Sequence, residues 1–307
     1  MSKRVGLIGL GAIGLPVGKR LLGAGHDLTV VPHVNREPAE ELAALGAKIA
    51  GSPRDLTGDC EVLVTSLPDV PQVREVLFGD GGFANSASTG QLHIDLSTIT
   101  PSAAQEFHSR LAEQGIASVD APVSGGPTRA ADGTLTIMVG GDEAAFDRAA
   151  PILSALGSSI TRVGGPGSGQ AVKLVNQLMI SVIMLANAEA LTLGVKAGVP
   201  LETLTSVIST ASGANGLLQH WLPKTLFTGD VSGGFALDLL MKDLSAALSW
   251  AAELKSPTFG GAIAQQLYRL AQLDGHGRHD YSSVATVYEQ AAGVELRMPR
   301  AKSEDKQ

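Results

Sequence analysis

The sequence contains one lysine whose surroundings suit acid–base chemistry. Lys173 lies near the start of a long apolar stretch that follows the glycine-rich segment 164–169, and Asn176 and Gln177 come three and four residues later. On a helix, this spacing places the amine and both amides on one face. Burying polar groups costs free energy unless they find partners, so their position in an apolar helix points to a function. A capped helix start with a solvated lysine is the simpler alternative.

The chemistry open to Lys173 is proton transfer. Desolvation and a neighbouring positive charge lower the pKa of a lysine toward neutrality, so that its amine can act as an acid or a base. The protonated amine also stabilises a developing alkoxide. Lys242, inside a later apolar helix, is a second cation that either pairs with Asp243 beside it or reaches toward a bound cofactor or substrate.

A second group of residues suits a dinucleotide. The short apolar strand Val5–Ile8 is followed by Gly9-Leu10-Gly11-Ala12-Ile13-Gly14 and by a predicted helix at Leu15–Leu22. In such a unit the first glycine makes the tight turn, the second lets the backbone approach a pyrophosphate, and the third lets helix and strand pack closely. The helix N-terminus favours the anion because its first N–H groups lack partners. We therefore predict that residues 9–14 bind the cofactor.

The segment after the second predicted strand indicates which dinucleotide is bound. An NAD site places an acidic residue there to hold the ribose 2′-hydroxyl. Residues 28–36 contain no acid, and they end in Asn35 and Arg36. A guanidinium suits the additional phosphate of NADP. NADP is therefore the predicted cofactor, with NAD as the second choice; an Arg36 that is merely solvated is the alternative.

Strands alternate with helices in the first half of the chain. Predicted strands span 5–8, 27–31, 62–66, 92–96, 117–119, 135–139 and 160–163, and predicted helices span 15–22, 38–45, 70–77, 101–114 and 143–156. This alternation predicts an α/β fold with a Rossmann-type doubly wound sheet. Ligands bind such sheets beyond the carboxyl ends of the strands. Leu67-Pro68, Ser97-Thr98 and Ser124-Gly125-Gly126 fall at such ends, so one cofactor can touch all three.

The second half of the chain is predicted to be helical. Helices are expected at 170–194, 201–210, 236–254, 258–273 and 283–292, with Gly194 ending the first of them. We expect a Rossmann domain at residues 1–164 and an all-helical domain at 165–295, joined by the long helix. A charged tail at 296–307 is expected to fray from Arg297.

Composition narrows the choice of partners. A net charge of -7 argues against nucleic acid and anionic membranes, and the uncharged run 174–188 is shorter than a membrane span. The single cysteine, Cys60, is predicted to be buried, and no metal site is predicted. Because a strand begins at once, we expect no signal peptide and a cytoplasmic location. The apolar helical half predicts a homodimer or homotetramer.

Taken in order, these motifs resemble those of the β-hydroxyacid dehydrogenases, which include 3-hydroxyisobutyrate dehydrogenase, tartronate semialdehyde reductase and the glyoxylate/succinic semialdehyde reductases. The resemblance covers residues 4 to about 292. It rests on Gly9-x-Gly11-x-x-Gly14, Leu67-Pro68, Ser97-Thr98, Asp120-Ala121-Pro122-Val123-Ser124-Gly125-Gly126, Gly167-x-Gly169-x-x-x-Lys173-x-x-Asn176 and Lys242-Asp243.

The resemblance implies an NAD(P)-dependent oxidoreductase that transfers a hydride between nicotinamide and a short 3-hydroxy acid or semialdehyde acid. It implies that Lys173 is catalytic, that Ser124-Gly125-Gly126 and Asn176 bind the substrate carboxylate, and that Lys242 lies on the nicotinamide side. Two departures stand out. The family usually has a second asparagine where this chain has Gln177, and the segment 32–34 here precedes Asn35-Arg36.

Two alternatives belong to other functional classes. Imine reductases share the two-domain plan and use NADPH, but they commonly have Asp or Tyr in place of Lys173. A non-catalytic cofactor-binding protein would keep the fold and lose the lysine or the Ser-Gly-Gly block, whereas this chain has both. The substrate is not named by the sequence; its determinants are expected in the loop 212–221 and at Phe235.

Overall fold

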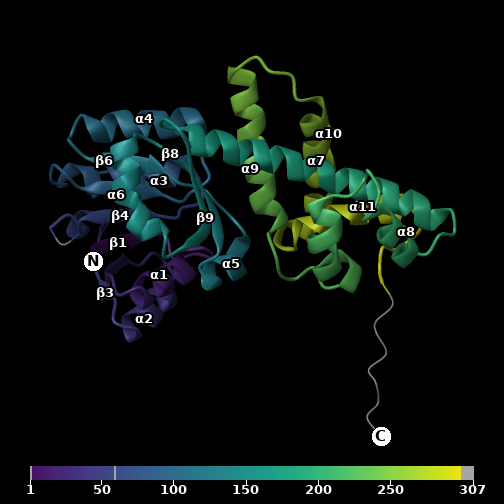
Figure 1. Cartoon of the computed structure of the whole chain (residues 1–307), viewed down its shortest axis with the longest axis horizontal. Coiled ribbons are helices and arrows are strands. Elements are labelled where there is room, and N and C mark those ends of the chain that lie inside the picture. The colour runs from purple at the N-terminus through teal and green to yellow at the C-terminus, as the bar shows by residue number, and fades with distance from the viewer. Residues whose placement is uncertain (1, 59, 299–307) are drawn as a thin grey trace, which may run out of the picture. The chain divides into compact units, whose positions relative to one another are not determined.

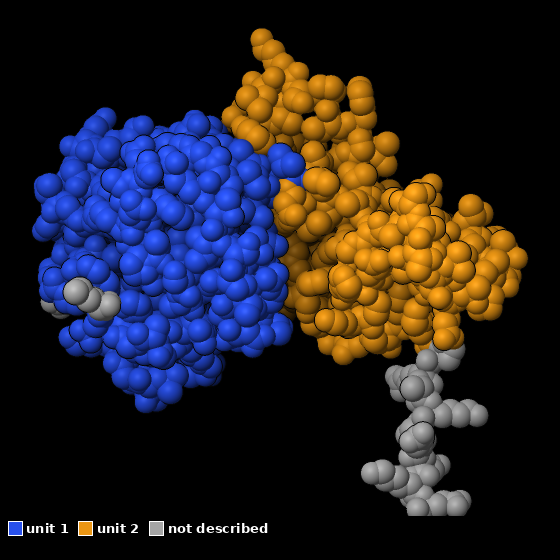
Figure 2. All heavy atoms as spheres, in the orientation of Figure 1, with its two compact units in different colours: residues 1–175 blue, residues 176–307 orange. Residues whose placement is uncertain are grey.

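The computed structural model describes residues 2–58 and 60–298. Residues 1–175 and residues 176–307 form two compact units, coloured separately in Figure 2. The boundary lies inside α7 (Ser168–Lys196), whereas the sequence predicts a domain boundary between residues 164 and 165. The first turns of α7 belong to the first unit because they are hydrogen-bonded to the ends of two of its strands.

The first unit is built on one twisted sheet. Among residues 2–58 and 60–175, nine strands form this sheet: β1 (Arg4–Ile8), β2 (Asp27–Val31), β3 (Lys48–Ile49), β4 (Val62–Thr65), β5 (Leu92–Asp95), β6 (Ala117–Asp120), β7 (Val123–Ser124), β8 (Leu135–Gly140) and β9 (Gly157–Gly164). The order is β3-β2-β1-β4-β5-β6-β8-β7, with β9 beside β8. Strands β1 to β6 are parallel, and β8 runs antiparallel to β6 and β7. The predicted doubly wound sheet is confirmed, and its order reverses between β1 and β4.

Helices cover both faces of this sheet (Figure 1). They are α1 (Gly14–Gly23), α2 (Glu37–Ala44), α3 (Val70–Phe78), α4 (Pro101–Ala112), α5 (Gly126–Asp132) and α6 (Glu143–Leu153). Successive side chains of β4 enter different cores, since Val62 and Val64 join one cluster and Leu63 joins the other. Strands buried on both faces are typical of parallel sheets.

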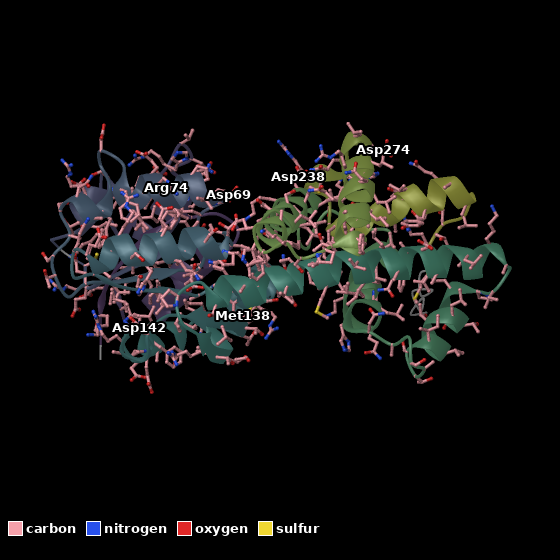
Figure 3. The ribbon with its side chains drawn as sticks, turned by 90° about the horizontal axis from the view of Figure 1, so that it is seen from above. Asp69, Arg74, Met138, Asp142, Asp238 and Asp274 are labelled. Carbon is pink, nitrogen blue, oxygen red and sulfur yellow. The ribbon has the colours of Figure 1, made fainter. Side chains whose placement is uncertain are left out.

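Side-chain caps fix the starts of two helices at the carboxyl edge of the sheet. The Asp69 carboxylate accepts a hydrogen bond from Val70 N–H at the start of α3, the helix that also carries Arg74 (Figure 3). Thr100 caps α4 by accepting from Ala103 N–H, as its position before a proline predicts. The elements β3, β7 and α5 are not predicted, because two strands have two residues each and α5 begins in a glycine–proline sequence typical of a turn.

The second unit is helical, as predicted. Beyond α7 it contains α8 (Leu201–Ile208), α9 (Leu237–Glu253), α10 (Phe259–Leu273) and α11 (Ala285–Ala292). A π-helical turn (Leu217–Trp221) and 3₁₀ turns (Leu222–Lys224, Leu226–Thr228, His276–Arg278, Tyr281–Val284) connect them. These turns are not predicted from the sequence, because single turns carry too little periodicity. One apolar cluster around Met184, Leu240 and Tyr268 forms the core of this unit.

The prediction that Gly194 ends the long helix is wrong. Helix α7 continues to Lys196, and Gly198 follows it with a φ of +89°. Val199 N–H donates to Gly194 O and Gly198 N–H donates to Val195 O, which is the Schellman arrangement of a helix C-terminus. Gly194 instead allows close packing, since a Cβ there would lie 2.6 Å from a methyl carbon of Leu204 on α8.

Two further expectations concern membrane spanning by α7 and the burial of Cys60. By length and composition alone, α7 is able to cross a membrane, a test that core helices of soluble proteins also pass. Its buried face carries Gln170, Lys173 and Gln177. Cys60 is buried beside β4, as predicted.

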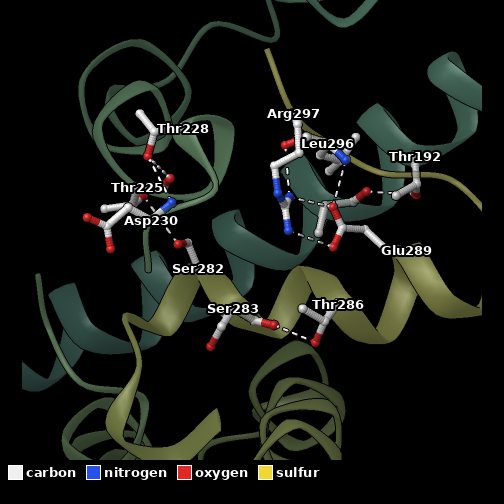
Figure 4. A network of polar contacts seen from close by, with 11 residues as sticks. Thr192, Thr225, Thr228, Asp230, Ser282, Ser283, Thr286, Glu289, Leu296 and Arg297 are labelled. Carbon is white, nitrogen blue, oxygen red and sulfur yellow. Dashed lines mark hydrogen bonds and ion pairs between the residues drawn. The ribbon is translucent and has the colours of Figure 1, made fainter. Parts of the chain in front are cut away.

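The predicted charged tail is packed at its beginning. Leu296 is fully buried, and Glu289 of α11 accepts hydrogen bonds from Leu296 N–H and from the Arg297 guanidinium (Figure 4). Met298 N–H donates to Phe227 O. The expectation that the chain frays from Arg297 is therefore wrong for residues 297 and 298, because a buried carboxylate and an apolar side chain anchor this segment. Residues 299–307 lie outside the described residues.

Candidate functional site

The turn after β1 places its three glycines in different environments. Gly9 has a φ of +94°, and a Cβ there would lie 2.1 Å from Ser66 O. A Cβ on Gly14 would lie 1.7 Å from Gly9 O, so the backbone excludes a side chain at both positions. A Cβ on Gly11 would meet no atom within 4 Å. The turn is closed by its first and third glycines and open at its second.

This turn leads into the N-terminus of α1. Its N-cap residue is Ile13, whose side chain makes no capping hydrogen bond. The first N–H groups of a helix have no partner within the helix and favour an anion. With open space at Gly11 in front of them, a pyrophosphate can reach these groups. The predicted residues Gly9, Leu10, Gly11, Ala12, Ile13 and Gly14 therefore form a turn that fits a dinucleotide.

The residues that follow β2 are exposed. Asn35 Oδ1 accepts a hydrogen bond from Glu37 N–H over 3.0 Å, which fixes the turn into α2. Arg36 is the N-cap residue of α2, and its side chain is exposed. The guanidinium of Arg36 makes no ion pair with any residue in the described ranges. Arg36 therefore presents an accessible cation, whereas the side-chain oxygen of Asn35 is used to bind the backbone N–H of Glu37.

The turns after β4 and β5 are hydrogen-bonded to one another. Leu67 N–H donates to Ser97 Oγ over 2.8 Å, and Ser97 N–H donates to Asp95 Oδ1 over 3.0 Å. Pro68 is exposed and Thr98 is half-buried beside the buried Ser97. The structure thus brings the predicted contacts Leu67, Pro68 and Thr98 to one edge of the sheet.

A buried hydrogen-bond chain fixes the strand ends beneath this edge. Thr65 Oγ1 donates to Asp95 Oδ1 over 2.8 Å and lies 2.8 Å from His93 Nε2. A hydroxyl has a single proton, which goes to the carboxylate, so His93 Nε2–H must donate to Thr65. Burial lowers the pKa of His93, and the charge of Asp95 opposes this shift. His93 is therefore a neutral structural donor at neutral pH.

Asp120, at the end of β6, fixes the start of α7. Its Oδ1 accepts from Gly167 N–H over 2.8 Å, and its Oδ2 accepts from Gln170 N–H over 2.9 Å. Burial raises the pKa of this carboxyl, and the two N–H donors act against the shift. Gly167 has a φ of +83°, and a Cβ on Gly169 would lie 2.4 Å from the carbonyl oxygen of Met138, labelled in Figure 3. Both glycines are needed for the helix to begin against the sheet.

Lys173 lies one helical turn beyond Gln170, on the same buried face of α7. Only 6% of the Lys173 residue surface is exposed. Because Gln170 is bonded to the ends of β5 and β6, the backbone of Lys173 lies one helical turn from the point where α7 is held to the carboxyl edge of the sheet. The predicted catalytic lysine is therefore buried on a rigidly anchored helix start.

The segment Ser124-Gly125-Gly126 forms the turn between β7 and α5. Gly125 has a φ of +132° and Gly126 a φ of +70°. A Cβ on Gly125 would lie 2.7 Å from Cδ of Arg129, whereas a Cβ on Gly126 would meet no atom within 4 Å. Gly126 therefore exposes its backbone to an approaching ligand, as Gly11 does in the first turn.

In the second unit, a chain of polar side chains connects Asn176 with Lys242. Asn176 Nδ2 donates to Gln177 Oε1 over 3.0 Å, and Gln177 Nε2 donates to Asp243 Oδ2 over 2.7 Å. Asp243 Oδ1 pairs with Lys242 Nζ over 2.9 Å. The local ion pair of Lys242 is thus present. Gln177 and Asp243 are buried, so the amide of Gln177 satisfies a carboxylate that would otherwise be costly to bury.

The expected substrate determinants of the second unit are held by buried polar groups. Asn215, in the loop 212–221, exchanges two hydrogen bonds with Asn187 of α7, of 3.0 and 2.9 Å. Asp280 is fully buried and accepts from Trp221 Nε1–H over 3.0 Å and from Phe235 N–H over 2.9 Å. Burial raises the pKa of Asp280. The loop and Phe235 are therefore fixed features of this unit.

Comparison with known proteins agrees with this geometry. Residues 4–165 match the NAD binding domain of 6-phosphogluconate dehydrogenase, and residues 167–288 match the NAD-binding domain of NADP-dependent 3-hydroxyisobutyrate dehydrogenase. The 2-(hydroxymethyl)glutarate dehydrogenase of Eubacterium barkeri is 39% identical over 295 residues, which cover 96% of this chain and 98% of that protein. The structure of Mycobacterium tuberculosis 3-hydroxyisobutyrate dehydrogenase with L-serine superposes with a TM-score of 0.88 at 32% identity, covering 94% of this chain and 99% of that one.

The chain belongs to the β-hydroxyacid dehydrogenase family.

As a β-hydroxyacid dehydrogenase, the protein is an NAD(P)-dependent oxidoreductase of the class that interconverts hydroxy acids and the corresponding aldehyde acids. An imine reductase from Myxococcus stipitatus also superposes, with a TM-score of 0.65 at 22% identity and coverage of 94% of this chain and all of that one. At that identity the likeness shows a shared fold alone. The resemblance drawn from the motifs is confirmed.

Several polar residues of this β-hydroxyacid dehydrogenase site are not assigned a role from the sequence. They are Asp95, Asp120 and Gln170; Asp243 is expected as the ion-pair neighbour of Lys242, but its bond to Gln177 is not. Asp120 and Asp243 stand inside motifs that the sequence singles out, but their hydrogen-bond donors Gly167 and Gln177 lie 47 and 66 residues away. The position of each aspartate inside a motif indicates that it matters. The fold is needed to show which N–H group it binds, and therefore what it does.

Proposed function

We propose that Lys173 is the general acid and base of this enzyme, and that the substrate is a short 3-hydroxy acid or the matching semialdehyde acid. The observation that carries the proposal is the burial of Lys173 on a helix start bonded to the carboxyl edge of the sheet. Ligands of doubly wound sheets bind at that edge. In the oxidising direction the amine accepts the proton of the alcohol; in the reducing direction it donates a proton to the carbonyl oxygen.

The chemistry of the relatives supports the choice of substrate class. 2-(Hydroxymethyl)glutarate and L-serine each carry a primary alcohol on the carbon next to the one that bears the carboxylate. When bound, the nicotinamide supplies or accepts the hydride. The protein must therefore bind a carboxylate about two carbons away from the reacting carbon and polarise the oxygen there.

We assign the carboxylate to the turn Ser124-Gly125-Gly126. The open backbone at Gly126 and the half-exposed Ser124 offer N–H and hydroxyl donors to an anion. Asn176, one turn beyond Lys173 on α7, is the second proposed donor. Its Nδ2 already donates one proton to Gln177, which leaves the second amide proton for the substrate.

The experiment that tests this function is a panel of aldehyde acids with NADPH and with NADH. Glyoxylate, succinic semialdehyde, methylmalonate semialdehyde and tartronate semialdehyde are compared, and Lys173→Met runs alongside. We expect turnover of at least one acid, and a fall of roughly 10²–10⁴-fold in kcat for the variant, the range of general acid–base catalysis. Unchanged kcat in Lys173→Met contradicts the role of the lysine. Cofactor binding without turnover of any acid favours an imine substrate or a non-catalytic role.

We further propose that NADP is preferred over NAD. Support comes from the exposed Arg36 after β2 and from the lack of an acid at residues 28–36. Arg36→Ala should raise KM for NADPH about tenfold, the loss of one charge-assisted contact, and leave KM for NADH unchanged. Lys48→Ala, which removes an exposed cation from the neighbouring β3, is the matched control. An equal effect on both cofactors would count against this assignment.

The second unit also supports a proposed homodimer or homotetramer. On α10 an exposed apolar stripe follows a helical spacing, with Phe259 80% and Leu273 78% exposed and Ile263 and Leu270 between them. The start of α10 lies against α7, where Val182 is also exposed. An apolar surface of this kind usually marks an interface. Ile263→Asp should yield a monomer in sedimentation analysis, and a wild-type monomer at micromolar concentration would refute the proposal.

A further inference from the structure

Gln170 stands out among the buried polar residues because its side chain joins two parts of the proposed site. It is fully buried in the first turn of α7. Its Nε2 donates to Ser97 O over 2.8 Å, and its Oε1 accepts from Ile99 N–H over 3.1 Å. Its backbone N–H donates to Asp120 Oδ2. One residue therefore ties the helix to the ends of both β5 and β6.

The two side-chain bonds enclose one residue, Thr98. Ser97 O and Ile99 N–H belong to the peptide groups on either side of Thr98, and they are the two groups that a neighbouring strand would pair with. Strand β5 ends at Asp95, before this turn, and Ser97 is held there by Leu67 N–H and by the Asp95 carboxylate. The primary amide of Gln170 pairs with the peptide groups on either side of Thr98, as a neighbouring strand would. Ser97 and Ile99 are buried, and Thr98 is half-buried.

The backbone of Gln170 belongs to α7, the helix that carries Lys173. Residues three apart on a helix have their Cβ atoms about 5–6 Å apart on one face. A shift of the Thr98 turn relative to the first turn of α7 would therefore move the proposed cofactor contact relative to the amine. Misplacement of about 1 Å can cost about 10²-fold in rate.

We propose that Gln170 is a positioning residue that holds the Thr98 turn and the Lys173 amine in a fixed relation through its side-chain amide. The proposal rests on the cofactor contact predicted above for Thr98 and on the role proposed for Lys173. Gln170 itself need not touch substrate or cofactor. Its effect depends on one donor and one acceptor presented side by side.

The first test replaces the amide with a group of the same shape that titrates. A protonated carboxyl in Gln170→Glu offers one donor and one acceptor, as the amide does, whereas the carboxylate can only accept. Burial raises the pKa of a carboxyl, to 8–9 in documented cases, so the variant keeps the proton over part of the assay range. We expect its kcat to lie within about threefold of wild type near pH 6 and to fall about tenfold or more behind wild type by pH 9. The ratio to wild type cancels the pH dependence of the reaction itself.

Two further variants distinguish the loss of the two hydrogen bonds from a change in side-chain volume. Gln170→Met keeps the volume and removes both bonds; we expect kcat to fall about 10–100-fold at every pH. Gln105→Met is the matched control, because Gln105 is an exposed glutamine that donates one 3.3 Å bond to Pro166 O just before α7. Its kinetics should equal those of wild type. A wild-type kcat in Gln170→Met, or a pH-independent ratio for Gln170→Glu, overturns the proposal.

A readout without turnover keeps this test distinct from that of the proposed function. Hydrogen exchange at the Ile99 amide, followed by mass spectrometry with fragmentation, should be slow in wild type, slower with NADPH, and fast in Gln170→Met with or without NADPH. The Ser97 amide donates to Asp95 and not to Gln170, so its exchange should stay slow in the variant. If wild type turns over no acid, the function proposed above fails, while this exchange pattern still supports the clamp at Thr98. Exchange at the Ile99 amide that NADPH leaves unchanged in wild type overturns the inference.

Discussion

Two glycine-rich turns enter helices in the first unit, and they put the helix N-termini to opposite uses. Residues 9–14 lead from β1 into α1, and residues 164–169 lead from β9 into α7. The start of α1 has no side-chain cap and faces open space at Gly11. At the start of α7, the N–H groups of Gly167 and Gln170 donate to the Asp120 carboxylate. The difference between the two turns comes from Asp120. The first turn can receive an anion, whereas the second is occupied by this carboxylate and holds the helix of Lys173 in place.

The largest effect is expected from a substitution that disrupts the first turn. A Cβ on Gly14 would lie 1.7 Å from Gly9 O, a backbone atom that cannot move away without opening the turn. Gly14→Ala should weaken NADPH binding at least 100-fold and lower the free energy of unfolding by about 4 kcal/mol or more. Titration of nicotinamide fluorescence and urea unfolding measure the two effects.

Gly11→Ala sharpens the same point. Its Cβ enters open space in the structure, so stability should match wild type, while the methyl group occupies the place proposed for the pyrophosphate. We expect NADPH affinity to fall about tenfold, equivalent to about 1.4 kcal/mol. Unchanged affinity in Gly11→Ala would show that the anion does not bind against this turn.

The second turn should depend on Asp120 for stability and not for dinucleotide affinity. Asp120→Ala leaves the N–H groups of Gly167 and Gln170 without their acceptor, at a cost of about 1–3 kcal/mol for each buried group. We expect a loss of about 2–6 kcal/mol in urea unfolding, with a Kd for NADPH within threefold of wild type when measured well below the melting temperature. A loss confined to NADPH affinity would reverse the contrast between the two turns.

A smaller effect is expected farther along α7. Gln177→Leu removes the hydrogen bond to the buried Asp243 and should cost about 1–3 kcal/mol. Gln219→Leu is the control, since Gln219 is exposed and donates one bond to Ser209 O. Equal stability of both variants in urea would mean that the polar chain of the second unit contributes nothing measurable.

The smallest effect is a pH dependence at His93, which supports the strand ends between the two turns. Burial lowers its pKa below the ordinary 6.5, so the unfolded chain binds a proton at His93 more readily than the folded one. The stability that neutral His93 contributes is present above pH 6.5 and is lost as pH falls toward the lowered pKa. Between pH 7.5 and 5.5, wild type should lose about 1 kcal/mol more than His93→Gln in urea unfolding. Parallel curves for the two proteins would contradict this.

Features built from the backbone were predictable from the sequence. The doubly wound sheet, the helical second unit and the turn 9–14 follow from strand–helix alternation and from glycine spacing, because glycine positions report directly on φ and on close approach. Lys173, Asn176 and Gln177 were singled out on the same helix face for a similar reason: their spacing is local.

Features built from long-range side-chain pairing were not predictable. Asp120 bonds to residues 47 and 50 positions later, and Gln170 bonds to Ser97, 73 positions earlier. A single sequence does not state which buried carboxylate meets which amide. Gly194 illustrates the converse error: its type indicates a helix end, but it lies inside α7, where the lack of a Cβ leaves room for the Leu204 side chain.

The burial of Cys60 has a practical consequence for measuring this protein. It is the single cysteine in the sequence, and only 4% of its surface is exposed, so thiol reagents should modify it slowly in the folded state. A fluorophore or spin label would then react almost entirely with a second cysteine introduced at an exposed position, and hardly at all with Cys60. The chain is in effect already prepared for single-site spectroscopy, without a prior substitution that would disturb the core beside β4.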